Sequence, residues 1–327
     1  MRKRNRPALP ILVGFLVAVL RADAIGVETT EYERALQGER RSIQQIHLEM
    51  ESDYVCGNGT SVTRSKREIW QDGDKRRCDE IREYLDGKGV TEVPPHRFVS
   101  IETPEYFVAW NSRDDVSAYF GLKSERNYRG HKLLLPPDPR LLGLAASETF
   151  ALYGQGPCWD RVIDSANRVT PVEIKMEAGS VKVTFAVASG TAVEQVYVLL
   201  GKKQLLRSLT LSDEQIRWTM KWDYPTEHVA GIAFPSDLHI KDVHGDEVRS
   251  EEKSKIHVLA INEPIERSRF SIVTAGLPPG TPVIGAAVPA GLLKGFPYHH
   301  IEWNGEALVP VENREITPSG SAKVEPK

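Results

Sequence analysis

The sequence has few of the features that identify a specialised class of protein. Its 327 residues include only 3 cysteines, and 42 Lys and Arg nearly balance 45 Asp and Glu. Because neither sign of charge dominates, the composition does not favour binding to nucleic acid. The sequence shows no repeating unit and no long low-complexity stretch, and its apolar fraction of 40% is ordinary for a globular protein. These absences exclude a disulfide-rich scaffold, a solenoid, a disordered tail protein and a multispan membrane protein.

Motifs of catalysis and of cofactor binding are also missing. The chain has no Gly-x-Ser-x-Gly elbow, no His-Glu-x-x-His, no phosphate-binding or dinucleotide-binding glycine motif and no Cys-x-x-Cys. A carboxylate pair of the glycosidase kind has no fixed spacing, so an enzyme stays as a third alternative. Since an acidic residue in a strand is far more often solvated than catalytic, we expect a protein without catalytic activity and without a cofactor.

The histidines offer only a weak candidate for a metal site. Asp237 and His239 lie two residues apart on a predicted strand and share a face, with His244 nearby. A zinc site would need third and fourth ligands that this pattern does not supply. The adjacent His299 and His300 point to opposite sides of any strand. We therefore expect exposed strand residues here, and no metal site.

The longest apolar run is short and lies close to the N-terminus. Residues 1–24 contain a basic start, an apolar segment at 8–20 and the small-residue pattern Ala22-Asp23-Ala24. As a helix, that segment is roughly 20 Å long, well short of the ~30 Å hydrocarbon core of a bilayer. The pattern predicts a cleaved export signal, with a membrane anchor as the less favoured alternative. The mature chain is expected in an extracytoplasmic space, periplasmic or secreted.

Most of the remaining chain is predicted to form β-strands. Turn sequences, Gly57-Asn58-Gly59 and Asp72-Gly73-Asp74, separate three strand-like segments between residues 44 and 86. Charged residues opposite the apolar positions indicate a sheet that is not buried on both faces. Further strand-like segments lie at 96–103, 105–112, 116–123, 181–187, 193–201, 204–212, 216–222, 231–243, 251–262 and 269–276.

Helical periodicity is confined to segments 27–41, 140–153 and 159–167. Because helices do not alternate with strands, a parallel α/β sheet is disfavoured. The sequence predicts a mainly β (α+β) protein, one long antiparallel meander with a helical insertion near 139–167. Two arrangements fit this pattern. One is a curved sheet or incomplete β-barrel with helices covering its concave face, and the other is a sandwich of two sheets.

The order of these elements resembles that of a known family. A secreted chain that opens with a helix, runs a strand meander, breaks for a Pro-rich segment with helices and then resumes antiparallel strands resembles the LolA/LolB-like lipoprotein-sorting proteins. The segment Asp138-Pro139-Arg140-Leu141-Leu142-Gly143 and the run from Phe270 to Val283 look like parts of larger bacterial relatives. The resemblance covers about residues 28–285. It implies an incomplete β-barrel closed by helices over a hydrophobic cavity that holds acyl chains.

These observations divide the chain into four expected parts. Residues 1–24 form the signal peptide, and 25–285 form the LolA/LolB-like β-rich domain. A C-terminal extension follows at 286–312, and 313–327 are expected to be a disordered tail because they lack apolar periodicity.

Two groups of residues are candidates for a ligand site. Trp218, Met220 and Trp222 share one strand face, where they would form a broad apolar surface, although plain core packing is the competing interpretation. The expected cavity wall comprises these three with Leu142, Phe150, Val183 and Phe185. The expected rim, which would meet anionic headgroups or an acidic partner, comprises Arg126, Arg129, His131, Lys132 and Arg140. For the rim, ordinary surface charge is the competing interpretation.

We therefore expect an exported, non-catalytic binder or carrier of lipid, lipoprotein acyl chains or another hydrophobic ligand. An envelope protein is a candidate partner. The alternative is a structural or protein-interaction β-sandwich module of the cell envelope, which a filled interior would favour.

The cysteines give the first testable prediction. In the expected meander, Cys56 lies beside Thr60 and Cys78 pairs near Arg67, which separates the two cysteines by roughly 23 Å against the ~7 Å limit for a disulfide. We expect free or buried thiols, with a bridge from either residue to Cys158 as the alternative. A thiol assay on denatured, unreduced protein should count all 3 cysteines. A lower count would show that one of them is bridged.

Overall fold

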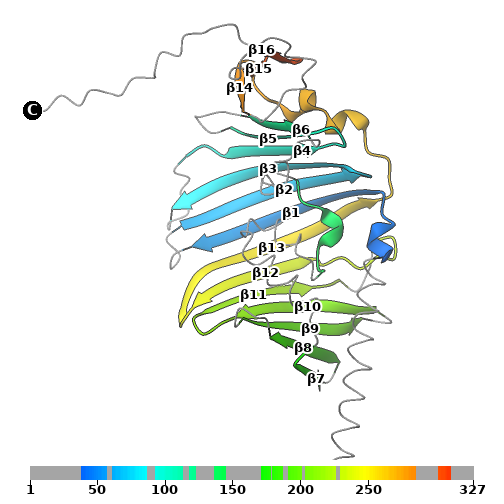
Figure 1. Cartoon of the computed structure of the whole chain (residues 1–327), viewed down its shortest axis with the longest axis vertical. Coiled ribbons are helices and arrows are strands. Elements are labelled where there is room, and N and C mark those ends of the chain that lie inside the picture. Colours follow the sequence, from blue (N-terminus) through cyan, green and yellow to red (C-terminus); the bar gives the residue numbers. More distant parts are fainter. Residues whose placement is uncertain are drawn as a thin grey trace, which may run out of the picture.

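The computed structural model describes residues 38–56, 61–86, 93–112, 118–122, 136–144, 171–177, 179–186, 191–200, 203–225, 229–284 and 301–310. These residues form one 16-stranded sheet that is curved and unclosed, with β7 and β16 at its opposite ends (Figure 1). The mainly β prediction is confirmed. The described strands belong to a single sheet, so the two-sheet sandwich is not what they form.

The strands follow the expected segments closely in most of the chain. The first group is β1 (Gln45–Cys56), β2 (Ser61–Asp72), β3 (Lys75–Asp86), β4 (His96–Glu102), β5 (Tyr106–Asn111) and β6 (Ala118–Leu122). The second group is β7 (Glu173–Glu177), β8 (Ser180–Ala186), β9 (Ala192–Leu200), β10 (Lys203–Ser212), β11 (Ile216–Asp223), β12 (Asp237–His244) and β13 (Glu247–Ile261). The last group is β14 (Thr281–Ile284), β15 (Ile301–Trp303) and β16 (Leu308–Pro310).

The sheet contains two meanders and not the single one expected. The first runs from β1 in the centre to β6, and the second runs from β7 at the far end back to β13, which pairs antiparallel with β1 (Figure 1). Strand β14 then pairs with β6 in parallel, and β15 and β16 continue the sheet beyond it. Local apolar alternation predicts strands but not which distant strands pair, and this explains the error.

The hairpin between β2 and β3 corrects the expected register of the cysteines. Its turn contains Gly73 in a left-handed conformation (φ 58°), and Asp72 pairs directly with Lys75. This shorter turn pairs Cys78 with Ile69 and not with Arg67. Cys56 and Cys78 are both free, as predicted, and burial raises the pKa of the Cys78 thiol to about 12. Cys158 lies outside the described residues.

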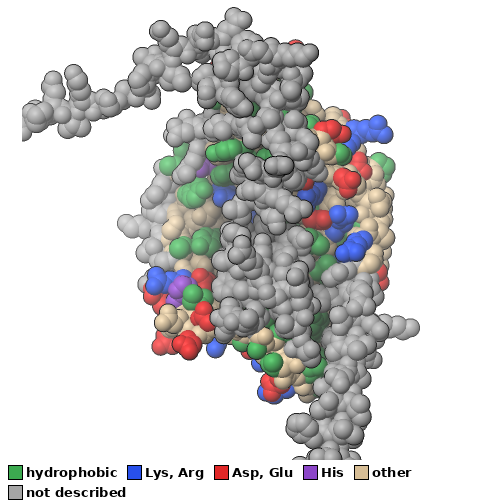
Figure 2. Space-filling view, viewed as in Figure 1, with side chains coloured by type: hydrophobic (Ala, Val, Ile, Leu, Met, Phe, Trp, Pro, Cys, Tyr) green, Lys and Arg blue, Asp and Glu red, His purple; other side chains and the backbone are tan. Residues whose placement is uncertain are grey.

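The two faces of the sheet bury different clusters. We call the side that carries Leu48, Met50 and Met220 the inner face and the opposite side the outer face. The inner-face residues belong to the larger apolar cluster. A second cluster lies on the outer face over β4, β5 and β6, where Trp70, Val99 and Phe270 are buried. In the space-filling view, charged side chains of the described residues show mainly toward the margins (Figure 2).

The outer-face cluster contradicts two expectations. Residues 269–276 are not a strand but parts of two 3₁₀ helices, η4 (Arg267–Phe270) and η5 (Ile272–Ala275). They bury Phe270 and Ala275 against the sheet, so the sheet is buried on both faces at this end. In β5, Phe107 to Trp110 are all buried. An unbroken apolar run of this kind, without alternation, is typical of a strand that is buried on both faces of its sheet.

Helical structure in the described residues is limited to a turn at 38–41 and the 3₁₀ helices η2 (Pro139–Leu141), η4 and η5. The helix expected at 140–153 does not start at Arg140, because η2 ends at Leu141 with Leu142 as its C-cap, and Gly143 takes a left-handed φ of 74°. A helical cover of the concave face is therefore not supported by the part of the chain that can be described. Residues 1–24, 27–37, 145–153, 159–167, 299–300 and 313–327 lie outside the described ranges.

Arg77 attaches the two 3₁₀ helices to the outer face. Its side chain is only 2% exposed and donates to the carbonyl oxygens of Arg269 (2.7 Å) and Thr274 (3.0 Å). It also pairs with Asp79 through two hydrogen bonds of 2.5 and 2.8 Å. The five donors of a planar guanidinium allow one side chain to satisfy several acceptors at once.

Replacing Arg77 should therefore destabilise the fold. We expect Arg77→Met to lower the free energy of unfolding by about 3 kcal/mol, because Asp79 and the two carbonyls lose a buried donor. Denaturant unfolding followed by circular dichroism measures this change. The matched control is Arg249→Met, because the Arg249 side chain is 58% exposed. This substitution should change the free energy of unfolding by less than about 0.5 kcal/mol. Equal effects of the two substitutions would contradict the role assigned to Arg77.

Candidate ligand site on the inner face

A short segment, residues 136–144, passes over the inner face and is held there by Arg40. The Arg40 guanidinium is 1% exposed and donates to the carbonyl oxygens of Arg140 (3.0 Å), Leu142 (2.5 Å) and Ala233 (2.5 Å). It also lies over the ring of Phe234, 3.9 Å from the ring centre. A buried guanidinium needs hydrogen-bond acceptors, so these bonds hold residues 136–144 against the inner face. We call residues 136–144 the strap.

Tyr224 also holds the strap, at Gly143 next to Leu142. The single proton of the Tyr224 hydroxyl is shared between the carbonyl oxygens of Leu206 (2.9 Å) and Gly143 (3.3 Å). A Cβ atom at position 143 would lie 2.6 Å from the Tyr224 oxygen, and the residue has a φ of 74°. Both facts require glycine at this position. Leu142, which the sequence placed in the cavity wall, is thereby held at 0% exposure among the inner-face residues.

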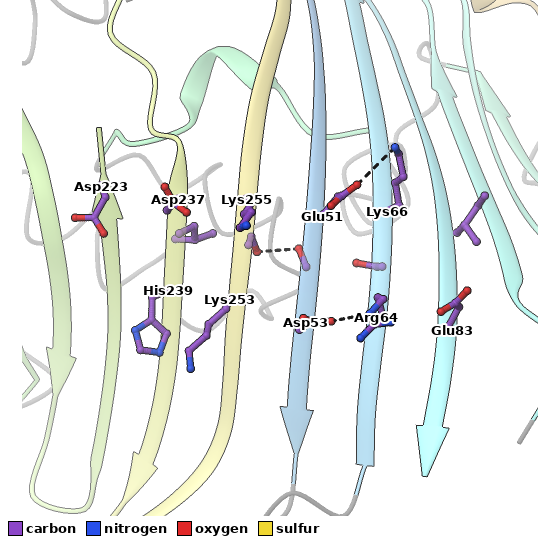
Figure 3. Close-up of a pocket in the computed structure, with 15 residues that line it drawn as sticks. Glu51, Asp53, Arg64, Lys66, Glu83, Asp223, Asp237, His239, Lys253 and Lys255 are labelled. Atoms are coloured by element: carbon purple, nitrogen blue, oxygen red, sulfur yellow. Dashed lines mark hydrogen bonds and ion pairs between the residues drawn. The ribbon is translucent and has the colours of Figure 1, made fainter. Parts of the chain in front are cut away.

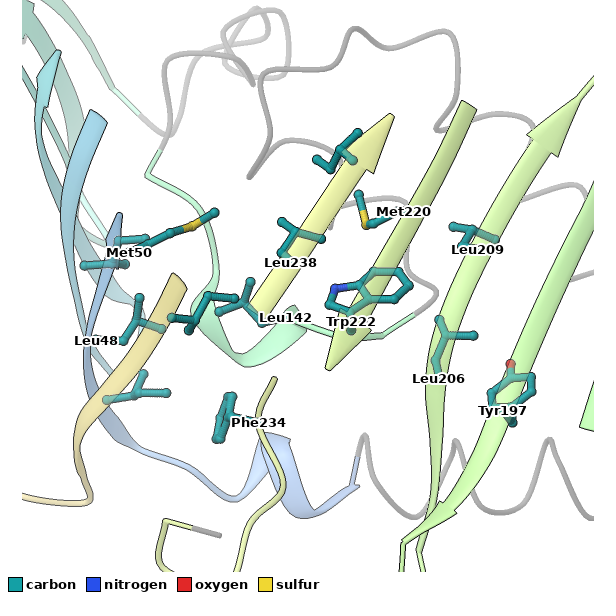
Figure 4. Close-up of a cluster of buried hydrophobic side chains, with 14 of the residues drawn as sticks. Leu48, Met50, Leu142, Tyr197, Leu206, Leu209, Met220, Trp222, Phe234 and Leu238 are labelled. Carbon is teal, nitrogen blue, oxygen red and sulfur yellow. The ribbon is translucent and has the colours of Figure 1, made fainter. Parts of the chain in front are cut away.

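The structure brings together the predicted wall residues that it describes. Trp218, Met220 and Trp222 on β11 lie in the same cluster as Val183 on β8 and Leu142 of the strap. Phe185 is partly buried against this cluster, and Phe150 lies outside the described residues. Figure 4 shows Met220 and Trp222 with Leu238, Leu209 and Leu142, from neighbouring strands and the strap. An apolar surface thus extends over β8 to β13 and β1.

Burial of these residues is nearly complete. Trp218, Met220 and Trp222 are 1%, 0% and 1% exposed. A cavity wall and a plain core both predict this result, so the exposed fractions alone do not distinguish the two interpretations. The wall assignment stays a prediction.

Beyond β1, the inner face changes from apolar to ionic. Arg67 on β2 donates to Glu80 on β3 over 3.0 Å, and Arg82 donates to the same carboxylate through two bonds of 2.8 and 2.9 Å. Burial alone would raise the pKa of Glu80, but Arg67 and Arg82 outweigh it and hold this pKa below its ordinary value. Arg82 also stacks over Phe98, 4.4 Å from the ring centre. We call Arg67, Glu80 and Arg82 the ionic group.

A row of small polar residues joins the apolar and ionic parts. The hydroxyls of Ser52 and Ser254 lie 2.8 Å apart, and the Ser254 hydroxyl donates to Glu252 over 3.2 Å. Ser52, Ser254 and Glu252 are all buried. The inner face is therefore amphipathic along the sheet, with an apolar part from β8 to β1 and a polar part from there to β4.

The outer face carries an open depression of about 690 Å³ across β12, β13, β1, β2 and β3. Its side chains alternate in charge from strand to strand (Figure 3). Asp237 pairs in register with Lys255, Lys255 with Glu51, and Glu51 with Lys66. Opposite charges in directly paired positions stabilise a sheet modestly, and this accounts for the pattern as a solvated face.

Of the metal candidates of the sequence, Asp237 and His239 line this depression, and His244 is not among its lining residues. The His239 ring contacts Glu251 at 2.7 Å, and His244 contacts Asp242 at 3.3 Å. Within the described ranges, no group of three or more His, Cys, Asp or Glu side chains is arranged to hold a metal ion. The Asp237 carboxylate instead accepts a hydrogen bond of 2.7 Å from the Ser236 hydroxyl.

Of the predicted rim, only Arg140 can be placed. Its guanidinium pairs with Asp138 over 2.7 Å, and this hydrogen bond raises the pKa of Arg140. The charge of Arg140 is therefore balanced within the strap, where Asp138 also caps η2. Arg126, Arg129, His131 and Lys132 lie outside the described residues.

Sequence reasoning missed Arg40 and the ionic group. Arg40 falls in a charged run at the end of an expected helix, where charges are usually solvated. The ionic group did leave a signal. Arg67 lies two residues before the buried Ile69, and Glu80 two residues after the buried Cys78, so both share a face with apolar residues.

Comparisons with known proteins return similar structures but no sequence match. No protein-family model matches the chain, and no curated protein matches it either. A DUF1329 family protein from Desulfovibrio piger is 10% identical, with a TM-score of 0.39, over 75% of this chain and 96% of that one. A putative outer-membrane lipoprotein-sorting protein domain from Vibrio parahaemolyticus is 10% identical, with a TM-score of 0.40, over 74% and 96%. LprF from Mycobacterium bovis is 10% identical, with a TM-score of 0.24, over 72% and 95%.

These neighbours include the kind of protein that the sequence resemblance named. The Vibrio parahaemolyticus domain is a protein of that kind. Since all three TM-scores are below 0.5, the comparison carries no argument about ligand or activity.

The ionic group leads to a prediction with a defined pH dependence. At neutral pH we expect Glu80→Gln to lower the free energy of unfolding by about 3 kcal/mol, because the Arg67 side chain, which is 13% exposed, and the partly exposed Arg82 lose their shared carboxylate. The lowered pKa means that Glu80 stabilises the fold fully above its unfolded-state pKa of about 4.3 and loses this effect as the pH falls through its lower folded-state pKa. The difference between wild type and variant should therefore shrink below about pH 4.

Denaturant unfolding at a series of pH values measures this difference. Glu173→Gln is the matched control, since the Glu173 side chain is 47% exposed in its pair with Lys175. It should leave stability within about 0.5 kcal/mol of wild type. A Glu80→Gln difference that is constant between pH 7 and pH 3 would contradict the assignment.

Proposed function

We propose that the protein is an exported, non-catalytic binder or carrier of a lipid or another hydrophobic ligand, with lipoprotein acyl chains as candidate cargo. The observation that carries this proposal is the amphipathic inner face. Its apolar part would contact hydrocarbon chains, while the buried polar row and the ionic group would lie beside the polar end of an amphiphile.

The dimensions of the apolar part are compatible with such a ligand. From β8 to β1 there are six steps between neighbouring strands, each ~4.8 Å, so this part is roughly 29 Å wide. An acyl chain in one leaflet of a bilayer extends across about half of a ~30 Å hydrocarbon core. Trp and Met side chains would adapt to a flexible chain, since their surfaces are large and polarisable.

The proposed location and the lack of catalysis rest on the sequence. The signal-like residues 1–24 support export, and no catalytic motif was found. Among the described residues, no helix is long and apolar enough to cross a bilayer. The Vibrio parahaemolyticus neighbour is described as a putative lipoprotein-sorting domain, and our proposal of an acyl-chain ligand stands on the inner face of this chain instead.

A structural or protein-interaction module of the envelope is the second candidate. It is favoured by the near-complete burial of Trp218, Met220 and Trp222, which a filled core also explains. The open, charged depression on the outer face would then be the surface for a protein partner.

The proposal predicts that protein purified from its native envelope retains lipid. Mass spectrometry of an organic extract should show lipid at a defined ratio to protein, and a fluorescent lipid probe should bind delipidated protein and change its Trp fluorescence. Phe185→Ser should weaken probe binding by about tenfold, because it places a hydroxyl against the apolar cluster.

The matched control is Val273→Ser, because the Val273 side chain is 57% exposed on η5. It should bind the probe as wild type does. Absence of retained lipid together with absence of probe binding would reject the carrier and leave the interaction module.

A further inference from the structure

The apolar part of the inner face contains a buried amide whose donors have no acceptor. Gln195 on β9 is 3% exposed, and its oxygen accepts a hydrogen bond of 2.6 Å from the Tyr197 hydroxyl. In the described part of the chain, Gln195 Nε2 has no partner. Its partners in register are Val183 and Leu209, which are both apolar.

A second unsatisfied donor lies in the same cluster. Trp222 on β11 is 1% exposed, and its indole Nε1 has no acceptor among the residues that can be described. Its partner in register on β12 is Leu238, another member of the apolar cluster. Figure 4 shows the Trp222 indole on the same side of the sheet as Tyr197 and Met220. Two buried N–H donors therefore project from an otherwise apolar surface.

Unsatisfied donors at full burial are rare in folded proteins, because each has lost its hydrogen bond to water. The arrangement is complementary to a ligand that brings neutral acceptor oxygens into the apolar part. A carboxylate would need a cation there, whereas the ionic group lies on β2 and β3, beyond the polar row.

We propose that Gln195 and Trp222 are specificity-determining residues that donate hydrogen bonds to the carbonyl oxygens of an acyl ester. This inference rests on the proposed function and deepens it. The ligand class is a neutral acyl-ester lipid, whose hydrocarbon lies on the apolar part while its ester oxygens face Gln195 Nε2 and Trp222 Nε1. A hydrocarbon or an alkyl ether of the same length lacks the carbonyl that these donors would bind.

A matched pair of probes tests the role of the carbonyl. 1-Palmitoylglycerol and 1-O-hexadecylglycerol have chains of equal length and differ in having an ester or an ether at the same place. Titration of delipidated full-length protein, followed by Trp fluorescence, should show that the ester binds about tenfold more tightly than the ether, as expected for one net hydrogen bond.

Substitution of either donor should reduce this preference. Gln195→Met and Trp222→Phe remove the N–H groups and keep an apolar side chain, so each should lower the ester-to-ether ratio to about threefold or less while ether binding persists. The matched controls are Gln215→Met, at an exposed glutamine, and Trp303→Phe, in the outer-face cluster. Both controls should keep the ratio of the wild type.

Infrared spectroscopy of the wild-type complex gives a result that does not depend on whether the variants fold. With 1-palmitoylglycerol labelled with ¹³C at the carbonyl, binding should shift the ester stretch to lower wavenumber than in hydrocarbon solvent, because the carbonyl accepts hydrogen bonds. Equal binding of ester and ether, with an unshifted carbonyl, would overturn this inference and leave the proposed function intact. Failure of both probes to bind would overturn both.

Discussion

The arrangement of the inner face depends on one buried cation. Arg40 follows the expected signal region, yet its guanidinium binds the carbonyls of Arg140 and Leu142 in the strap and of Ala233 before β12. A guanidinium at 1% exposure is tolerable only where such acceptors surround it. The N-terminal turn, the link between the two meanders and the approach to β12 are therefore held by the same group. Leu142 lies over the centre of the sheet as a consequence.

The same chemistry recurs where other segments are attached to the sheet. Arg77 binds the carbonyls of η4 and η5 on the outer face. A single sheet has two faces and no second layer of strands to cover either of them. Irregular segments cover parts of both faces here, and they carry backbone carbonyls that need donors. Arginine suits this task because its planar group supplies several donors in fixed directions.

Local pattern predicted much of the strand structure, and it failed where pairing is long-range. The segments around β1 to β3 and around β11 to β13 alternate clearly, and their strands lie close to the expected positions. The pairing of β1 with β13 joins residues about 200 positions apart, which alternation cannot indicate. The run 269–276 has strand composition, but Ser271 caps η5 and Gly276 ends it with a φ of 74°. Alternation of Trp218, Met220 and Trp222 predicted that they share one buried face, whereas Arg40 has no such pattern.

The chemical character of the inner face favours a binding surface over a plain core. A core that served stability alone would gain from apolar residues in place of Arg67 and Glu80, since replacing a buried ion pair by well-packed apolar groups is often neutral or stabilising. It would also gain from an acceptor for Gln195 Nε2, which has none among the described residues. These groups are costly where they stand, and the ligand that we propose, with a polar end and carbonyl oxygens, would decrease that cost. A plain core and a binding surface would both have the apolar part of the inner face. The polar groups within and beside that part distinguish the two interpretations.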